Sequence, residues 1–190
     1  MRYADIIQLK KSDYIDRLAE VQWFKYADQQ AVEEALRDTQ NNLMWLYTLE
    51  EFVFNEEEFN DAESYQQFLQ TLLMEFQIDF KAISADQDEN LIDIKIETSR
   101  GHYEYVVDLD DTDGYFDEAL ISFFLNKELL VKEQIIERFF FLPQIDENLS
   151  IYFTHPTIQH KAAKAGLIPG DNEFFDLIDS IKEDEEELDN

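Results

Sequence analysis

Four aspartates crowd one short stretch near the middle of the chain. Asp108, Asp110, Asp111 and Asp113 follow a pair of valines. Carboxylate oxygens are the ligands that Mg²⁺ and Ca²⁺ take in proteins. If Gly114 is placed at the sixth position of an EF-hand calcium loop, leucine falls at the first and twelfth positions, where a chelating side chain is required. The spacing therefore excludes an EF-hand and favours a solvated turn that leads into the next helix.

The segment Val106–Thr112 runs from apolar residues into Asp-x-Asp-x-Thr and resembles the first motif of the haloacid dehalogenase-like phosphatases. The resemblance implies that Asp108 attacks phosphorus, that Asp110 acts as acid and base, and that Mg²⁺ screens the carboxylates. In that family the motif lies on the first strand of a parallel sheet, whereas the pattern around it here predicts an antiparallel meander. We keep a Mg²⁺-dependent phosphohydrolase as an alternative, and predict no catalytic residue, metal site or cofactor.

The other residue types that often carry chemistry form no complete site. The chain has no cysteine, which excludes disulfides, thiolate zinc sites and a cysteine nucleophile. His155 and His160 are not at the i, i+4 spacing at which two histidines of one helix share a metal. We interpret both of them, and His102, as surface or capping residues. Lys161 and Lys164 add to a small basic group there, which suits a helix C-terminus.

Net charge is the dominant property of the sequence, because 15 lysines and arginines face 44 aspartates and glutamates and leave −29. A surface of this sign repels nucleic-acid phosphates and anionic lipid heads, so we expect no direct nucleic-acid or membrane binding. It attracts cations, including basic proteins. Solubility alone is the competing interpretation of the charge.

The acids gather in two stretches that contain no lysine or arginine, between Arg37 and Lys81 and between Arg100 and Lys127. Unneutralised acids speed the encounter with a basic partner, and aromatic residues among them are candidate anchors. A solvated face over buried phenylalanines is the competing interpretation. The candidate partner-binding residues are Glu50, Glu51, Glu56, Glu57, Glu58, Phe59, Asp61, Glu63, Asp110, Asp111 and Asp113.

Apolar periodicity predicts an α+β fold in which an N-terminal helical layer, about residues 12–77, packs on an antiparallel sheet. Helices are predicted from Ser12 or Asp13, from Asp28 as far as Phe54, and from Asn60 with Glu63 as its capping-box partner. A further helix is predicted over Tyr115–Leu130. The sheet has four or five predicted strands, at 78–85, around Ile92–Ile96, and at 102–109, 138–142 and 149–154.

Short helices are predicted at the C-terminal end. One runs from Pro156 to a C-terminal cap at Gly166, and another begins at Asp171. The acidic tail 182–190 is predicted to be disordered. Residues 1–181 then form one domain with a possible seam near residue 77.

These features predict a cytoplasmic binding protein and no enzyme, since the N-terminus lacks the apolar core of a signal peptide. The leading hypothesis is an inhibitor that neutralises a basic toxin or nuclease by direct protein–protein binding, as bacterial immunity proteins and antitoxins do. The alternative is a regulator that mimics nucleic acid and binds a DNA- or RNA-binding protein.

Overall fold

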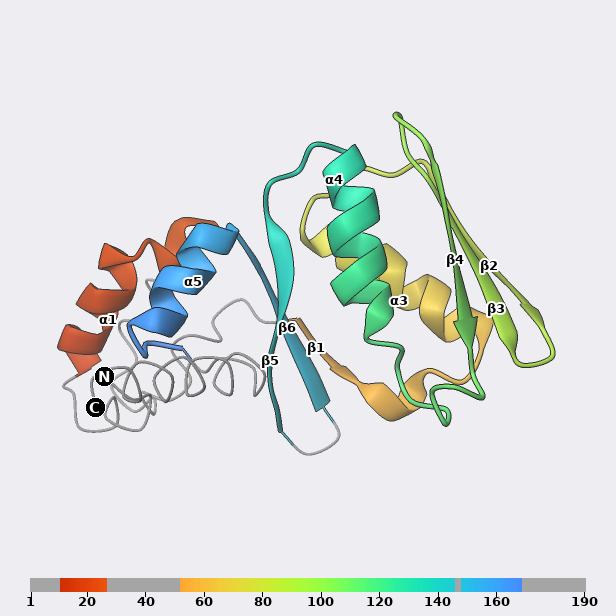
Figure 1. Cartoon of the computed structure of the whole chain (residues 1–190), viewed down its shortest axis with the longest axis horizontal. Helices are drawn as coiled ribbons and strands as arrows, with labels where there is room; N and C mark the ends of the chain where they lie inside the picture. The colour runs from red at the N-terminus through yellow and green to blue at the C-terminus, as the bar shows by residue number, and fades with distance from the viewer. Residues whose placement is uncertain (1–10, 27–51, 146–147, 169–190) are drawn as a thin grey trace, which may run out of the picture. The chain divides into compact units, whose positions relative to one another are not determined.

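The structure is a computed structural model that describes residues 11–26, 52–145 and 148–168 (Figure 1). The chain divides into two compact units. Unit 1 comprises Met1–Glu51, Phe141–Gln144 and Ser150–Asn190, and unit 2 comprises Phe52–Phe140 and Ile145–Leu149. The seam was predicted near residue 77, which lies inside unit 2. That residues 1–181 fold as one domain stays a prediction. The Asp171 helix, the tail 182–190, Glu50 and Glu51 lie outside the described residues, as does most of the helix predicted from Asp28.

Mixed α+β structure is confirmed, but the single sheet under an N-terminal helical layer is wrong. The described residues form two three-stranded antiparallel sheets, one in the order β2-β3-β4 and the other in the order β1-β6-β5. The first comprises β2 (Ala82–Asp88), β3 (Leu91–Glu97) and β4 (His102–Asp108). The second comprises β1 (Phe52–Asn55), β6 (Asn148–Thr154) and β5 (Arg138–Ile145).

Strand β1 corrects the predicted helix that ran as far as Phe54. An extended chain points residues i and i+2 to the same side, and here it brings Phe52 and Phe54 onto the ring of Phe68, with centroids 5.8 Å and 4.7 Å away. Packing of aromatic rings thus fixes an extended conformation where the sequence pattern favoured a helix.

Helix α3 (Ala62–Glu75) follows the short 3₁₀ turn η4 (Glu56–Glu58). Its N-cap is Asp61 and not Asn60, because the Asp61 carboxylate accepts the Ser64 N–H at 2.8 Å. At the other end Gln77 adopts a φ of 54° and Ile78 N–H bonds to the Leu73 carbonyl at 2.8 Å, which is a Schellman cap. Ile78 therefore closes the helix, and strand β2 begins four residues later than the predicted 78–85.

The predicted antiparallel meander is confirmed in β2, β3 and β4. Ile92, Ile94 and Ile96 point to one buried face, while Asp93 and Lys95 between them are exposed. Helix α3 and the helix that follows the meander lie on one side of this sheet in Figure 1. The alternating burial of β3 comes directly from the two-residue period of a strand.

The helix predicted over Tyr115–Leu130 begins later, as the π-helix η5 (Leu120–Leu129), and continues into α4 (Leu130–Lys132). Phe116 cannot join it because its ring is buried among other aromatics of unit 2. Asn126 of η5 accepts the N–H of Phe139 and donates to its carbonyl, at 2.9 Å and 2.8 Å. This paired contact holds the start of β5 beside the helix.

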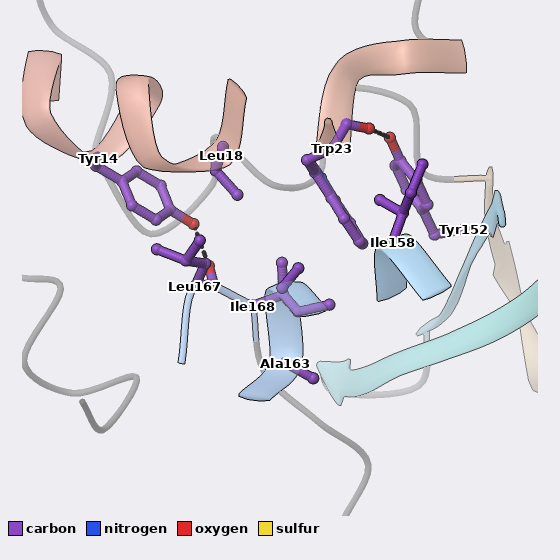
Figure 2. Close-up of a cluster of buried hydrophobic side chains, with 9 residues drawn as sticks. Tyr14, Leu18, Trp23, Tyr152, Ile158, Ala163, Leu167 and Ile168 are labelled. Carbon is purple, nitrogen blue, oxygen red and sulfur yellow. Dashed lines mark hydrogen bonds between the residues drawn. The ribbon is translucent and has the colours of Figure 1, made fainter. Parts of the chain in front are cut away.

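Unit 1 has its own core, drawn in Figure 2. Trp23 of the 3₁₀ helix η2 (Trp23–Tyr26) stacks on Tyr152 with ring centroids 4.3 Å apart, and the Tyr152 hydroxyl donates to the Trp23 carbonyl. The Tyr14 hydroxyl of α1 (Lys11–Glu20) donates to the carbonyl of Leu167. These contacts join segments that are more than 120 residues apart in the sequence.

Helix α5 (Pro156–Lys164) confirms the predicted start at Pro156 and cap at Gly166, whose φ is 65°. His155 caps its N-terminus by accepting the Thr157 N–H at 3.1 Å, so the predicted capping role of this histidine is confirmed. No helix among the described residues is long and apolar enough to cross a membrane.

We expect Phe59→Ala to lower the free energy of unfolding by about 3–5 kcal/mol, because it removes a buried ring that neighbouring side chains cannot replace. Phe59 is 4% exposed and touches four other aromatic rings of unit 2, those of Phe54, Tyr65, Phe68 and Phe116. Urea unfolding followed by circular dichroism measures the change. Val53→Ala is the control, since Val53 is 51% exposed, and equal losses in both variants would contradict this packing.

Candidate acidic interaction surface

Three acidic segments that are separate in the sequence meet at one end of unit 2. They are the stretch 56–63 around η4, the hairpin that joins β2 to β3, and the turn after β4. No lysine or arginine occurs in any of them. We call this composite surface the acidic end, and its members are Glu56, Glu57, Glu58, Asp61, Asp86, Asp88, Glu89, Asp108, Asp110, Asp111 and Asp113.

Hydrogen bonds between the three segments hold the acidic end together. Gln87 of the hairpin accepts the Ala62 N–H at 3.2 Å, next to the N-cap of α3. Asn90 at the hairpin tip accepts the Leu109 N–H at 2.8 Å, and its amide donates to the Asp110 carboxylate at 3.0 Å. Neutral amide side chains and backbone groups therefore link the three acidic segments, and Asn90 supplies a donor to one of the carboxylates.

The first and third segments are also joined directly. Phe116 N–H donates to the Glu56 carbonyl at 3.0 Å. Asp117 N–H donates to the Tyr65 hydroxyl at 3.1 Å, and its carboxylate accepts the Tyr105 hydroxyl at 2.7 Å. The two candidate stretches of the sequence are therefore neighbours in the fold, a proximity that their separation along the chain did not reveal.

Strand register extends the negative charge onto the exposed face of the meander. Asp86 of β2 lies opposite Asp93 of β3, and Leu91 of β3 lies between Asp88 and Asp108. Like charges directly opposite each other in a sheet are destabilising. The burial of the isoleucines on the other face offsets this cost and holds the carboxylates in a fixed array.

Cations occupy the opposite end of the meander. Lys81 lies 3.3 Å from the Glu97 carboxylate, and Arg100 lies in the turn between β3 and β4. The Lys132 ammonium is 5.5 Å from the centre of the Tyr103 ring. Unit 2 is therefore polarised along its strands. The end at turn 99–100 mixes these cations with Glu97 and Glu133, whereas the end at turn 89–90 carries carboxylates and no lysine or arginine.

The predicted site residues have unequal roles in the structure. Glu57 and Glu58 are exposed, and Glu56 is partly buried. Asp61 caps α3, and Glu63 accepts the Gln67 amide at 2.9 Å. Both carboxylates remain exposed while they make these local contacts.

The candidacy of Phe59 as an anchor for a partner needs correction. Its side chain is 4% exposed and lies in the aromatic core of unit 2. A buried ring offers no surface to a partner. Among the large apolar side chains of the meander, Leu91 and Val106 are the exposed ones, at 46% and 52%.

The Asp108–Asp113 stretch forms a turn. The Asp108 carboxylate accepts the Asp110 N–H at 3.0 Å, and the Asp111 N–H donates to the Asp108 carbonyl at 3.1 Å. Asp113 and Gly114 have φ angles of 52° and 83°. Within the described residues no three histidine, aspartate or glutamate side chains lie close enough to hold a metal ion together.

Two tyrosines beneath the acidic end have perturbed ionisation. Burial raises the pKa of Tyr65 to about 12; the hydrogen bond with the Asp117 backbone acts against this rise, and the Asp117 charge adds a smaller contribution to it. Burial also raises the pKa of Tyr105, and its hydrogen bond to the Asp117 carboxylate acts in the same direction. Both phenols therefore stay neutral and serve as fixed hydrogen-bonding partners for Asp117.

Sequence reasoning missed Asp86, Asp88 and Asp93 as members of a surface. The predicted strands at 78–85 and around Ile92–Ile96 leave Asp86 and Asp88 outside the sheet, although their i, i+2 spacing places them on one face if the strand continues. Comparisons of this chain with protein-family models, with curated proteins and with solved structures find no match.

Tyr65→Phe tests the burial of this phenol. Because its pKa is raised, the folded protein keeps the proton between about pH 10 and about pH 12, where the unfolded chain releases it. The contribution of Tyr65 to stability is complete below about pH 10 and is lost through this window. We expect the urea midpoint of Tyr65→Phe to fall less over the window than that of the wild type. Equal falls would contradict the assignment.

Proposed function

We propose that this chain is an acidic binding protein whose partner is a basic protein, and that it acts inside the cell as an inhibitor of a basic toxin or nuclease. The observation that supports this most is the acidic end, where three separate segments bring their carboxylates together without a single lysine or arginine among them. A charge that served solubility alone would have no need for this concentration at one end of a polarised unit.

The arrangement suits inhibition of a protein that binds nucleic acid. Such a protein has a positively charged cleft for phosphates, and a rigid array of carboxylates can occupy that cleft. Steering by opposite charge raises the association rate and weakens as salt increases. Leu91 and Val106 lie within the acidic face and supply apolar area that charge alone lacks.

Affinity capture of partners from the source cell, followed by mass spectrometry, tests this function. The binding rate of a captured basic protein is then measured by surface plasmon resonance at two salt concentrations. The acidic-end variant carries Glu57→Gln, Asp88→Asn and Asp111→Asn. We expect its association rate at low salt to fall by about tenfold, with a flatter dependence on salt.

A matched variant controls for net charge. It carries Asp16→Asn, Glu20→Gln and Glu75→Gln, which removes three exposed charges outside the acidic end. Its association rate should stay within about twofold to threefold of the wild type. Equal losses in both variants would show that net charge alone governs binding. A captured protein that duplex DNA displaces would favour nucleic-acid mimicry, and the absence of any basic partner would refute the proposal.

A further inference from the structure

The meander has two edges, and the register shows which backbone groups each edge presents. In an antiparallel pair, alternate residues exchange both backbone hydrogen bonds. The Thr98 N–H donates to the Gly101 carbonyl at 2.9 Å, and the Leu109 N–H donates to the Asn90 carbonyl at 2.8 Å. Residues 103, 105 and 107 of β4 therefore bond to β3, and the N–H and carbonyl groups of His102, Glu104 and Val106 point outward.

The edge formed by β2 is covered by helix α3. The outward N–H of Ala85 donates to the Gln66 side chain at 3.2 Å, and the Gln87 side chain accepts the N–H of Ala62 at the start of the helix. Gln66 of α3 thus occupies a hydrogen-bonding position that another strand would need, and the bond from Ala62 to Gln87 holds the start of the helix against β2. Covering an edge in this way is a common protection against unwanted pairing.

For the edge formed by β4, the described ranges 11–26, 52–145 and 148–168 supply no such cover. Within the described part of the chain, the outward backbone groups of His102, Glu104 and Val106 make no hydrogen bond, and the side chains of all three are exposed. The strand is straight enough to pair with β3 over its full length, from His102 to Asp108. It is therefore a ready template for one more strand.

We propose that an extended, lysine- or arginine-rich segment of the basic partner adds to the free edge of β4 as a fourth strand. This inference rests on the proposed function and assigns its mode of binding. Main-chain hydrogen bonds to Glu104 and Val106 supply affinity that does not depend on the partner's sequence. Alternate basic side chains lie beside Glu104 and Asp108. Glu104 has Lys95 of β3 opposite it, whereas the row of Asp108 continues through Leu91 to Asp88 and contains no cation, so Asp108 is the stronger attraction. The residues between the basic ones lie toward half-buried Tyr105.

Charge also decides against a second copy of this chain as the occupant. In the antiparallel register that places the two Val106 residues opposite each other, Glu104 of one copy faces Asp108 of the other. In the register centred on Glu104, the two Glu104 side chains face each other. Like charges that face each other across two strands destabilise the pair. The same carboxylates that attract a basic strand therefore keep the free edge from self-association.

Two synthetic peptides of equal length and charge serve as probes, one alternating lysine with valine and the other alternating lysine with proline. Proline has no N–H to donate and cannot pair as an inner strand. We expect only the lysine–valine peptide to slow hydrogen exchange of the Glu104 and Val106 amides, by at least about tenfold at saturation. Exchange is followed residue by residue by nuclear magnetic resonance of the full chain.

Val106→Pro removes an outward N–H and leaves the bonds between β4 and β3 intact. It should reduce binding of the lysine–valine peptide by at least about tenfold, whereas Val106→Thr should bind as the wild type does. Glu104→Lys is a second test that does not alter the backbone. It should weaken the lysine–valine peptide and strengthen a glutamate–valine peptide.

The outcomes separate the mode of binding from the function. Equal binding of the two lysine peptides without slowed exchange would overturn strand addition and leave electrostatic binding by the acidic end standing. The same holds if a captured basic partner binds Val106→Pro and the wild type equally. Failure of both peptides, together with the absence of any basic partner, would overturn this inference and the proposed function together.

Discussion

Unit 2 depends on the packing of aromatic rings around Phe68. Its ring lies 4.7 Å from that of Phe54, 5.1 Å from that of Phe59 and 5.0 Å from that of Phe116. These rings come from a strand, a turn, a helix and a loop, and most of their contacts are edge-to-face, the arrangement that the ring quadrupoles favour. Since acidic residues flank most of them in the sequence, burial of the rings is what brings the acids together.

The same packing accounts for the repulsion that the acidic end tolerates. Glu58 adjoins buried Phe59 and Asp108 adjoins buried Val107, so these acids cannot separate without disturbing the core of unit 2. The Asn90 amide donates to the Asp110 carboxylate, and the Gln87 side chain accepts the Ala62 N–H, so neutral groups link the three segments. A preorganised field of this kind costs no further ordering when a cation arrives, which is the physical basis for fast encounter.

How much could be predicted from the sequence depended on the range of the interactions. The meander and helix α5 were predicted because a period of two on β3 and the pair Pro156 and Gly166 are local signals. Strand β1 was missed because its conformation is set by Phe68 and β6, which are distant in sequence. The late start of β2 was missed because Gln77 takes a helix-capping conformation that usually marks glycine.

The same distinction applies to the site. Local composition identified Glu56–Glu58 and Asp110–Asp113 as acidic, and the structure shows that both lie at one end of unit 2. The burial of Phe59 and the acidic row through Asp86 and Asp93 depend on tertiary packing and strand register. An unpaired strand edge likewise cannot be recognised from the sequence, because it depends on whether another part of the fold packs against that strand.

The two edges of the meander differ in their hydrogen bonding because different helices pack beside β2 and β4. Helix α3 enters from the acidic end, and its Asp61 cap and Gln66 place it against β2, so that edge is closed by the same segment that builds the acidic surface. The opposite edge lies beyond β4, whose inner face is held by Tyr105 against Phe124 of η5, with ring centroids 5.1 Å apart. That contact fixes the face of β4, and within the described ranges its outward backbone groups make no hydrogen bond. Exposed Glu104 and partly buried Asp108 place carboxylates along this edge. Charge on an edge strand opposes pairing with a second copy, and in the proposed mode of binding it favours a strand of opposite charge.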